Sequence, residues 1–467
     1  MEYKEEKVAG SMMVSATCNL NCEYCYIGKN DSLGSIDKEI IKEFEEKGVT
    51  NLLKDAYDKG LERLGLWGSE TTLYLEYFND EIFEILEYFD KLGHIFISSN
   101  FYDKKGVQKL VNLISEINSN LDDRSFEIRV QTSIDGDPRI NDETRKTLSG
   151  KGSTDNILEN LEFLVKEVSK MNLKDNFVIK HSFKSTLNIY RMKTLVNNDE
   201  YFLNYFRFFD SLGDIFTSFN LPDNFKWSLE SGHPTLVSPG NSDVEGGKLY
   251  ALYIKKIREL IIKNEDENTF KYLKIKFLLP YIGRLKEVEK EFVISREQNR
   301  AFACSASGRG YSLGVNGESH LCHRTYLHNH KNYKDLLAQT MSSYKQGRYE
   351  RFVDYFIVDK DNSEEFARQM YGINSYRDFA QLRFNNIYSN LKILAMSGQA
   401  HYKYLDDEEL SKLTTKFLMK VANCVVENFM ETGTFHAIPM QQIKIWANGA
   451  VQELIESYNE LKDRGIL

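Results

Sequence analysis

Short apolar runs alternate with longer amphipathic stretches from about residue 10 to residue 220. The short runs are rich in β-branched and aromatic residues, which predicts strands, and the longer stretches repeat apolar residues at helical spacing. The predicted strands are Ser11–Ala16, Arg63–Trp67, His94–Ser98, Glu127–Ser133, Phe177–Ser182 and Asp214–Phe219, and the predicted helices span 36–58, 75–91, 105–119, 154–170 and 188–209. This alternation predicts βαβ units around a parallel sheet, as a partial barrel or an open doubly wound sheet. In either case the chemistry is expected at the C-terminal ends of the strands.

The pattern changes after residue 220, which suggests three parts: 1–230, 231–300 and 301–467. Residues 220–245 are rich in Pro, Gly and Ser and are expected to form an irregular connection. A helix follows, with one apolar face made of Leu249, Tyr253, Ile257, Leu260 and Ile261. A Gly- and Ser-rich segment after residue 300 predicts a β-hairpin, and most of the remainder is expected to be helical, for example 374–396, 406–431 and 440–463.

Composition narrows the class of protein. The chain has 467 residues, of which 42% are hydrophobic and 28% charged, and no apolar run is long enough to span a bilayer. The net charge of −9 disfavours a broad basic surface for nucleic acid. Because the N-terminus lacks the apolar stretch of a signal peptide, a cytoplasmic location is expected. In a reducing compartment the six cysteines indicate metal binding or catalysis rather than disulfides.

Three of these cysteines lie close together, directly after the first predicted strand. Cys18, Cys22 and Cys25 occur in the segment TCNLNCEYCY. Thiolates bind soft metals, so zinc and an iron–sulfur cluster are the two candidate occupants. A structural zinc site uses four ligands, and no fourth Cys or His is near in sequence. Three ligands would leave one metal position open to a substrate or cofactor, which favours a catalytic cluster.

The spacing C-x-x-x-C-x-x-C followed by Tyr26 resembles the signature of the radical S-adenosylmethionine (SAM) superfamily. The resemblance implies that the three cysteines hold a [4Fe–4S] cluster whose fourth iron binds SAM, with Tyr26 beside the cofactor. After the second strand, LGLWGSETTL is similar to the family's Gly-Gly-Glu-Pro turn, which contacts the SAM amino group. Gly68 and Glu70 match, whereas Ser69 replaces a Gly and Thr71 the Pro. The alternative for this segment is an ordinary turn with a Glu at a helix N-terminus.

The next two strands extend the resemblance, which covers about residues 10–220. Asn100 follows the third strand, where relatives carry a Thr-Asn-Gly-like sequence, and is expected to face the site. The segment VQTSIDGDPRINDETR resembles a stretch found in the branch of sulfatase-maturating and ribosomal-peptide-modifying enzymes. There the resemblance assigns Ser133 to the SAM ribose or carboxylate region and Arg145 to the SAM carboxylate. Asp135 either contributes to the cofactor site or sets an Asp-Gly turn.

A second cysteine set resembles the SPASM and Twitch extensions of that branch, in which a β-hairpin supplies ligands to an auxiliary iron–sulfur cluster. Cys304, Gly317 and Cys322 have the matching spacing, and Cys424 is the remaining cysteine, so one auxiliary cluster is expected. A fourth ligand could come from His320, His323, another side chain or the substrate. The alternatives are that Cys424 is a buried core thiol and that no auxiliary cluster forms. The implied fold is a partial (β/α)6 TIM barrel followed by a Twitch/SPASM-like hairpin and a helical C-terminal region.

The resemblance implies reductive cleavage of SAM to a 5′-deoxyadenosyl radical, which abstracts hydrogen from a substrate C–H bond. A peptide or protein side chain is the expected substrate, to be crosslinked, oxidised or epimerised, and an amino acid, sugar or nucleoside is the alternative. Flavodoxin or ferredoxin is expected as the reductant. Because 17 residues precede Cys18, a leader-binding domain is not expected within the chain, although a separate leader-binding protein could act. No membrane or nucleic-acid partner is expected. An alternative from a different functional class is a non-catalytic protein that binds zinc or an iron–sulfur cluster.

Overall fold

A parallel sheet organises the structure, a computed structural model that describes residues 9–23, 25, 33–57, 59–229, 234–237, 243–267, 269–273, 311–313, 319–320, 408 and 451–466. Six of its strands are parallel and lie side by side in chain order: β1 (Ala9–Ser15), β3 (Arg63–Gly68), β4 (His94–Ser99), β5 (Phe126–Ser133), β7 (Phe177–Asn188) and β8 (Phe225–Ser228). The predicted α/β class, with the strand order of a partial (β/α)6 barrel, is confirmed.

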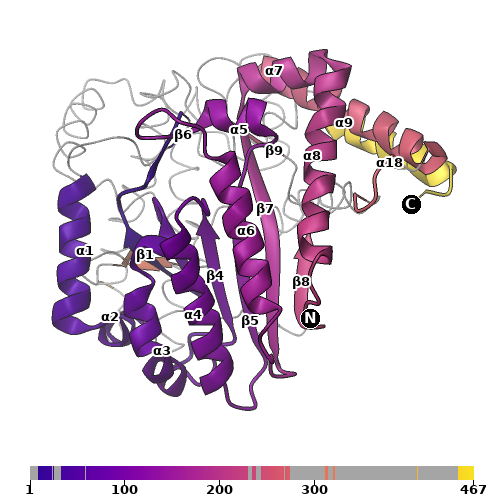
Figure 1. Ribbon diagram of the computed structural model, residues 1–467. Helices are drawn as coiled ribbons and strands as arrows, with labels where there is room; N and C mark the ends of the chain where they lie inside the picture. Colours follow the sequence, from indigo (N-terminus) through magenta and orange to yellow (C-terminus); the bar gives the residue numbers. More distant parts are fainter. Residues whose placement is uncertain are drawn as a thin grey trace, which may run out of the picture.

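Helices follow the strands and cover one face of the sheet, as Figure 1 shows for α3, α4 and α6. The helices of this part are α1 (Leu33–Lys47), α2 (Val49–Ala56), α3 (Glu76–Tyr88), α4 (Lys104–Asn120), α5 (Pro138–Thr144), α6 (Thr154–Val168), α7 (Ile189–Asn197) and α8 (Asp199–Thr217), with a short 3-10 helix η1 at Thr71–Tyr74. Alternate residues of the central strands, such as Ile128 and Val130, are fully buried beneath these helices.

The first predicted helix, 36–58, is two helices. Gly48 separates α1 from α2 with a φ of 79°, a left-handed conformation that favours glycine. The Glu81 carboxylate on α3 accepts hydrogen bonds from the N–H groups of Val49 and Thr50, at 2.9 and 2.7 Å. These bonds satisfy amides at the start of α2 that have no partner within the helix.

The predicted strand Asp214–Phe219 was wrong, because this segment is the end of α8 and the turn after it. The buried residues Phe202, Phe206, Phe209 and Phe216 are spaced as one face of a helix. At the end of this face the Phe216 ring contacts Phe183 on β7 and stacks on Trp227 on β8. The sixth parallel strand is β8, inside the stretch expected to be irregular. A four-residue strand flanked by turn residues carries too little periodicity to be recognised.

Beyond β8 the described elements are short strands and two helices. β9 (Pro234–Val237) pairs with the end of β7, and the long helix α9 (Asp243–Glu267) follows. The expected hairpin is confirmed by the antiparallel pairing of β10 (Tyr311–Leu313) with β11 (Ser319–His320), and β10 also extends the sheet beside β1. The C-terminal helix α18 (Val451–Asp463) packs on α9. None of the helices in the described part of the chain is long and apolar enough to cross a membrane.

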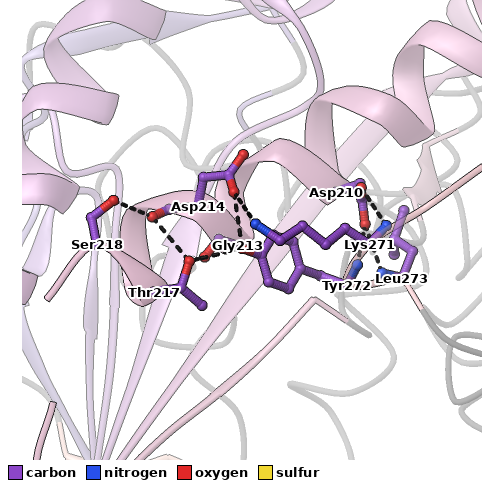
Figure 2. A network of polar contacts seen from close by, with 8 residues as sticks. All are labelled: Asp210, Gly213, Asp214, Thr217, Ser218, Lys271, Tyr272 and Leu273. Carbon is purple, nitrogen blue, oxygen red and sulfur yellow. Dashed lines mark hydrogen bonds and ion pairs between the residues drawn. The ribbon is translucent and has the colours of Figure 1, made fainter. Parts of the chain in front are cut away.

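The segment after α9 is fixed to the exposed side of α8 (Figure 2). The Asp210 carboxylate accepts the backbone N–H groups of Lys271, Tyr272 and Leu273 at 2.7–3.0 Å. The Tyr272 hydroxyl donates to Asp214 at 2.9 Å, and its ring lies over Gly213, where a β-carbon would collide with it. These contacts hold residues 271–273 against α8.

Candidate metal centre

The three clustered cysteines lie where the sheet predicts the chemistry, in the loop that follows β1. Cys18 precedes the short strand β2 (Leu20–Cys22), Cys22 ends it, and the Cys25 N–H donates to the Cys22 carbonyl at 3.2 Å. All three side chains are half-buried free thiols. In the described part of the chain, no three His, Cys, Asp or Glu side chains are close enough to form a ready metal shell, so the three sulfurs would have to converge on a bound metal.

The turn after β3 holds the end of β1 in place. Gly68 has a φ of 152°, and a β-carbon there would lie 2.7 Å from the Ser15 hydroxyl oxygen and 2.9 Å from the Ser15 nitrogen. The Ser69 N–H donates to the Ser15 carbonyl at 3.1 Å, and the Ser69 hydroxyl to the Ala16 carbonyl at 2.6 Å. Ser69, the departure from the Gly-Gly-Glu-Pro pattern, therefore adds a hydrogen bond that glycine could not make.

The Glu70 carboxylate is buried, with 1% of the residue exposed, and accepts four hydrogen bonds. The Thr72 N–H and hydroxyl and the Ser99 hydroxyl donate to Oε1 at 3.0, 2.6 and 2.7 Å, and the Asn100 N–H donates to Oε2 at 2.7 Å. Glu70 is thus the N-cap of η1, the arrangement that the sequence left as the alternative to an ammonium acceptor. It ties the ends of β3 and β4 together.

Asn100 faces the cysteine loop, as expected from its place after β4. Its side-chain nitrogen lies 3.3 Å from Cys18 Sγ and 2.7 Å from Asn19 Oδ1. The Leu20 N–H also points at Cys18 Sγ, at 3.4 Å. Two N–H donors therefore converge on one sulfur, which suits a sulfur that carries negative charge.

Asp37 on α1 is a site residue that the sequence did not reveal. Only 5% exposed, its carboxylate accepts the N–H groups of Ala16 and Thr17, the Thr17 hydroxyl and, at 3.0 Å, the Tyr74 hydroxyl. Burial, followed by the charge of Asp37, raises the pKa of Tyr74 to about 12. Asp37 therefore fixes the backbone just before Cys18. A single Asp in an amphipathic helix gives no signal for such a role.

Arg145 is brought beside Cys22 by a strand pair that the sequence also did not reveal. β6 (Arg145–Thr147) pairs with β2 in antiparallel fashion, with Arg145 opposite Cys22 and the Glu23 N–H donating to the Thr144 carbonyl at 3.0 Å. Three-residue strands have no recognisable pattern. Arg145 is 7% exposed, so a positive charge is held inside the loop region.

Asp135 lies in the turn after β5 and is fully buried. Its carboxylate accepts the Thr144 hydroxyl at 2.7 Å and the Thr186 N–H at 2.9 Å, which joins α5 to β7. Asp135 thus connects this turn to both elements from inside, and its charge also reaches Cys22. Ser133 ends β5, half-buried and in register with Lys184.

Electrostatics show what the thiols need in order to ionise. Burial, together with the negative charge of Glu70, raises the pKa of Cys18 to about 12. Burial likewise raises the pKa of Cys22 above its usual value, and the positive charge of Arg145 opposes this increase. A bound cation would reverse these shifts, because metal coordination deprotonates thiols outright. The cysteine chemistry, the sulfur donors and the buried Arg145 fit an iron–sulfur cluster.

Several predicted site residues lie outside the described residues: Tyr26, Cys304, Cys322, Cys424 and His323. The backbone of His320 lies in β11, beyond the hairpin turn. The cofactor roles of the first-loop residues and the ligands of the auxiliary cluster remain predictions.

Comparison with known proteins gave matches among solved structures. No family model matches the sequence, and no curated protein matches it. The chain is similar to native anSMEcpe with bound AdoMet, with 12% identity, a TM-score of 0.41 and coverage of 97% of this chain and 100% of the other. It is also similar to native anSMEcpe with bound AdoMet and Cp18Cys peptide, with 14% identity, a TM-score of 0.39 and coverage of 97% and 99%.

Proposed function

We propose that this protein is a radical SAM enzyme that modifies a peptide or protein side chain. The observation that carries the proposal is the loop of Cys18, Cys22 and Cys25 at the C-terminal end of β1, with N–H donors directed at one sulfur and Arg145 buried beside another. A [4Fe–4S] cluster held by these three cysteines would supply an electron for the cleavage of SAM and so generate the radical that abstracts hydrogen from the substrate.

The chain's own residues hold and orient the reactants in this proposal. Arg145 would pair with the SAM carboxylate, because a guanidinium offers two parallel donors to a carboxylate. The turn of Gly68 and Ser69 would bring backbone carbonyls close to the SAM amino group, with Ser133 at the nucleotide. Glu70, whose carboxylate accepts four internal hydrogen bonds, would act by shaping that turn.

The face of the sheet opposite α3, α4 and α6 suits a polar substrate. On β4, β5 and β7 the side chains that alternate with the helix-facing core include Ser98, Gln131 and Ser182, which share one register row and are half-buried. Their hydroxyl and amide groups can bind a peptide backbone or a polar side chain. The same row could hold an amino acid or a nucleoside, so the substrate test must include small molecules.

The test is SAM cleavage by anaerobically reconstituted protein. The wild-type protein should contain about four iron atoms for the first cluster, as a [4Fe–4S] cluster requires. When a reductant is added, it should release 5′-deoxyadenosine from SAM. Replacing Cys18, Cys22 and Cys25 together by Ala should abolish that release. A colourless protein that binds zinc and leaves SAM intact would instead support the non-catalytic binding protein.

The substrate class is tested with deuterium. If a candidate peptide deuterated at its side chains transfers deuterium to 5′-deoxyadenosine, the peptide donates the hydrogen. If deuterated amino acids, sugars or nucleosides transfer it and peptides do not, the small-molecule alternative is correct.

A further inference from the structure

The turn after β4 aims the Asn100 side chain at the Cys18 sulfur. Asn100 is 4% exposed, and its backbone N–H donates to Glu70 at 2.7 Å, which fixes the main chain. The Tyr102 N–H donates to the side-chain oxygen at 2.8 Å. Because a backbone N–H can only donate, this contact identifies the oxygen end of the amide, so the NH2 end is the one that faces Cys18.

Both hydrogens of that NH2 group have acceptors. One is directed to Asn19 Oδ1 at 2.7 Å and the other to Cys18 Sγ at 3.3 Å. A neutral thiol is a weak acceptor, whereas a metal-bound thiolate accepts N–H donors well. The amide is therefore oriented for the sulfur in its anionic, metal-bound form.

The backbone beside Asn100 is strained in a way that supports this orientation. Phe101 has a φ of 56°, a left-handed conformation that is unusual for a bulky residue. Such a conformation is unfavourable for a side chain of this size and persists only where its surroundings hold it. Here the buried Asn160 amide donates to the carbonyls of Phe101 and Tyr102, each at 2.9 Å, and the Phe101 N–H donates to the Ser99 hydroxyl at 3.0 Å.

We propose that Asn100 is a positioning residue that donates an N–H···S hydrogen bond to Cys18 and thereby raises the reduction potential of the cluster bound there. This inference rests on the proposed function. Reduction adds negative charge that is shared with the cysteine sulfurs, so a donor to sulfur stabilises the reduced form more than the oxidised form. Glu70 has the opposite effect, because its negative charge lies close enough to act on Cys18. Asn100, bonded to both residues, offsets that repulsion.

The experiment is a redox titration of the reconstituted protein, followed by electron paramagnetic resonance (EPR) without SAM. In Asn100→Ala the donor is lost, and the midpoint potential should become more negative than in the wild type. Asn100→Asp keeps the size of the side chain but turns an oxygen toward the sulfur, so its potential should be lower still. Asn79→Ala is the matched control, because its amide donates to the Lys109 carbonyl at 3.0 Å and serves no cysteine; its potential should equal that of the wild type.

Failure of the inference about Asn100 and failure of the proposed function would give different results. Equal potentials in the wild type, Asn100→Ala and Asn100→Asp would overturn the role of Asn100, and so would an equal shift in Asn79→Ala. If both Asn100 variants fold, as judged by far-UV circular dichroism, but lose the iron of the first cluster while Asn79→Ala keeps it, Asn100 acts in cluster assembly and its proposed role in setting the potential is overturned. If the wild type itself neither binds iron nor cleaves SAM, the proposed function fails instead.

Discussion

Replacing Gly68 by Ala tests whether the turn after β3 requires glycine. Gly68 adopts a φ of 152°, and its added β-carbon would come within 2.9 Å of the Ser15 nitrogen and 2.7 Å of the Ser15 hydroxyl oxygen. Ser15 is fully buried in β1 and cannot move aside without shifting the strand. Backbone strain of about 1–3 kcal/mol and overpacking of about 1–3 kcal/mol together predict a loss of about 2–6 kcal/mol in unfolding free energy.

The measurement is urea unfolding followed by circular dichroism, with Gly65→Ala as the control. Gly65 lies on the same strand, but its added β-carbon would lie 3.5 Å from the Ser11 β-carbon, an ordinary contact. The control should therefore change the unfolding free energy by less than about 1 kcal/mol. If Gly68→Ala and Gly65→Ala unfold at the same urea concentration with the same slope, the steric account of this turn is incorrect.

Three further predictions concern charged or titratable groups. Asp37→Asn should lower the unfolding free energy by about 1.5–3 kcal/mol, because it weakens the charge-assisted hydrogen bonds to this carboxylate. Tyr74→Phe removes one of these bonds and should lower the unfolding free energy by about 1 kcal/mol. Equal losses in urea unfolding would refute the central role of Asp37. Burial lowers the pKa of His181 to about 3, so the native state keeps this ring neutral. The protein should lose stability as pH falls from about 6.5 toward 3, by up to about 1.4 kcal/mol per pH unit. His181→Leu should make this decline shallower in urea unfolding at a series of pH values, and an unchanged slope would contradict the assignment. Arg258 on α9 pairs with Glu453 and Glu460 of α18 at 3.1 Å each. In Arg258→Met the backbone amides of α18 should exchange hydrogen faster than in the wild type, whereas those of α4 should not. If the exchange rates of α18 and α4 change by the same factor, these ion pairs do not hold α18.

Much of the sheet could be predicted because local patterns determine it. The first five parallel strands of the sheet, β1, β3, β4, β5 and β7, have alternating or continuous apolar runs. The three clustered cysteines can be recognised from their spacing alone, because they lie within the single loop after β1. The cross-connections could not be predicted, because they join residues far apart in sequence through short elements. Asp37 reaches the cysteine loop from a helix, and the pairing of β2 with β6 depends on two three-residue strands.

The role of Glu70 could not be predicted from sequence for a different reason. The same residue in the same turn can accept from a bound ammonium or cap a helix, and the sequence does not distinguish the two. The structure shows the cap, with Thr72 donating both its N–H and its hydroxyl. Ser99 and Asn100, at the end of the neighbouring strand, supply two further donors to this carboxylate, and their proximity appears only when β3 and β4 pair.

The central claim is that Cys18, Cys22 and Cys25 hold an iron–sulfur cluster with one iron open to SAM. The most direct measurement is the EPR spectrum of the anaerobically reduced protein, recorded before and after SAM is added. A reduced [4Fe–4S] cluster at this site should give a signal whose g values change when SAM binds, and replacing these three cysteines should remove that signal. A spectrum with no signal that responds to SAM, or a SAM-responsive signal that persists without these cysteines, would contradict this claim.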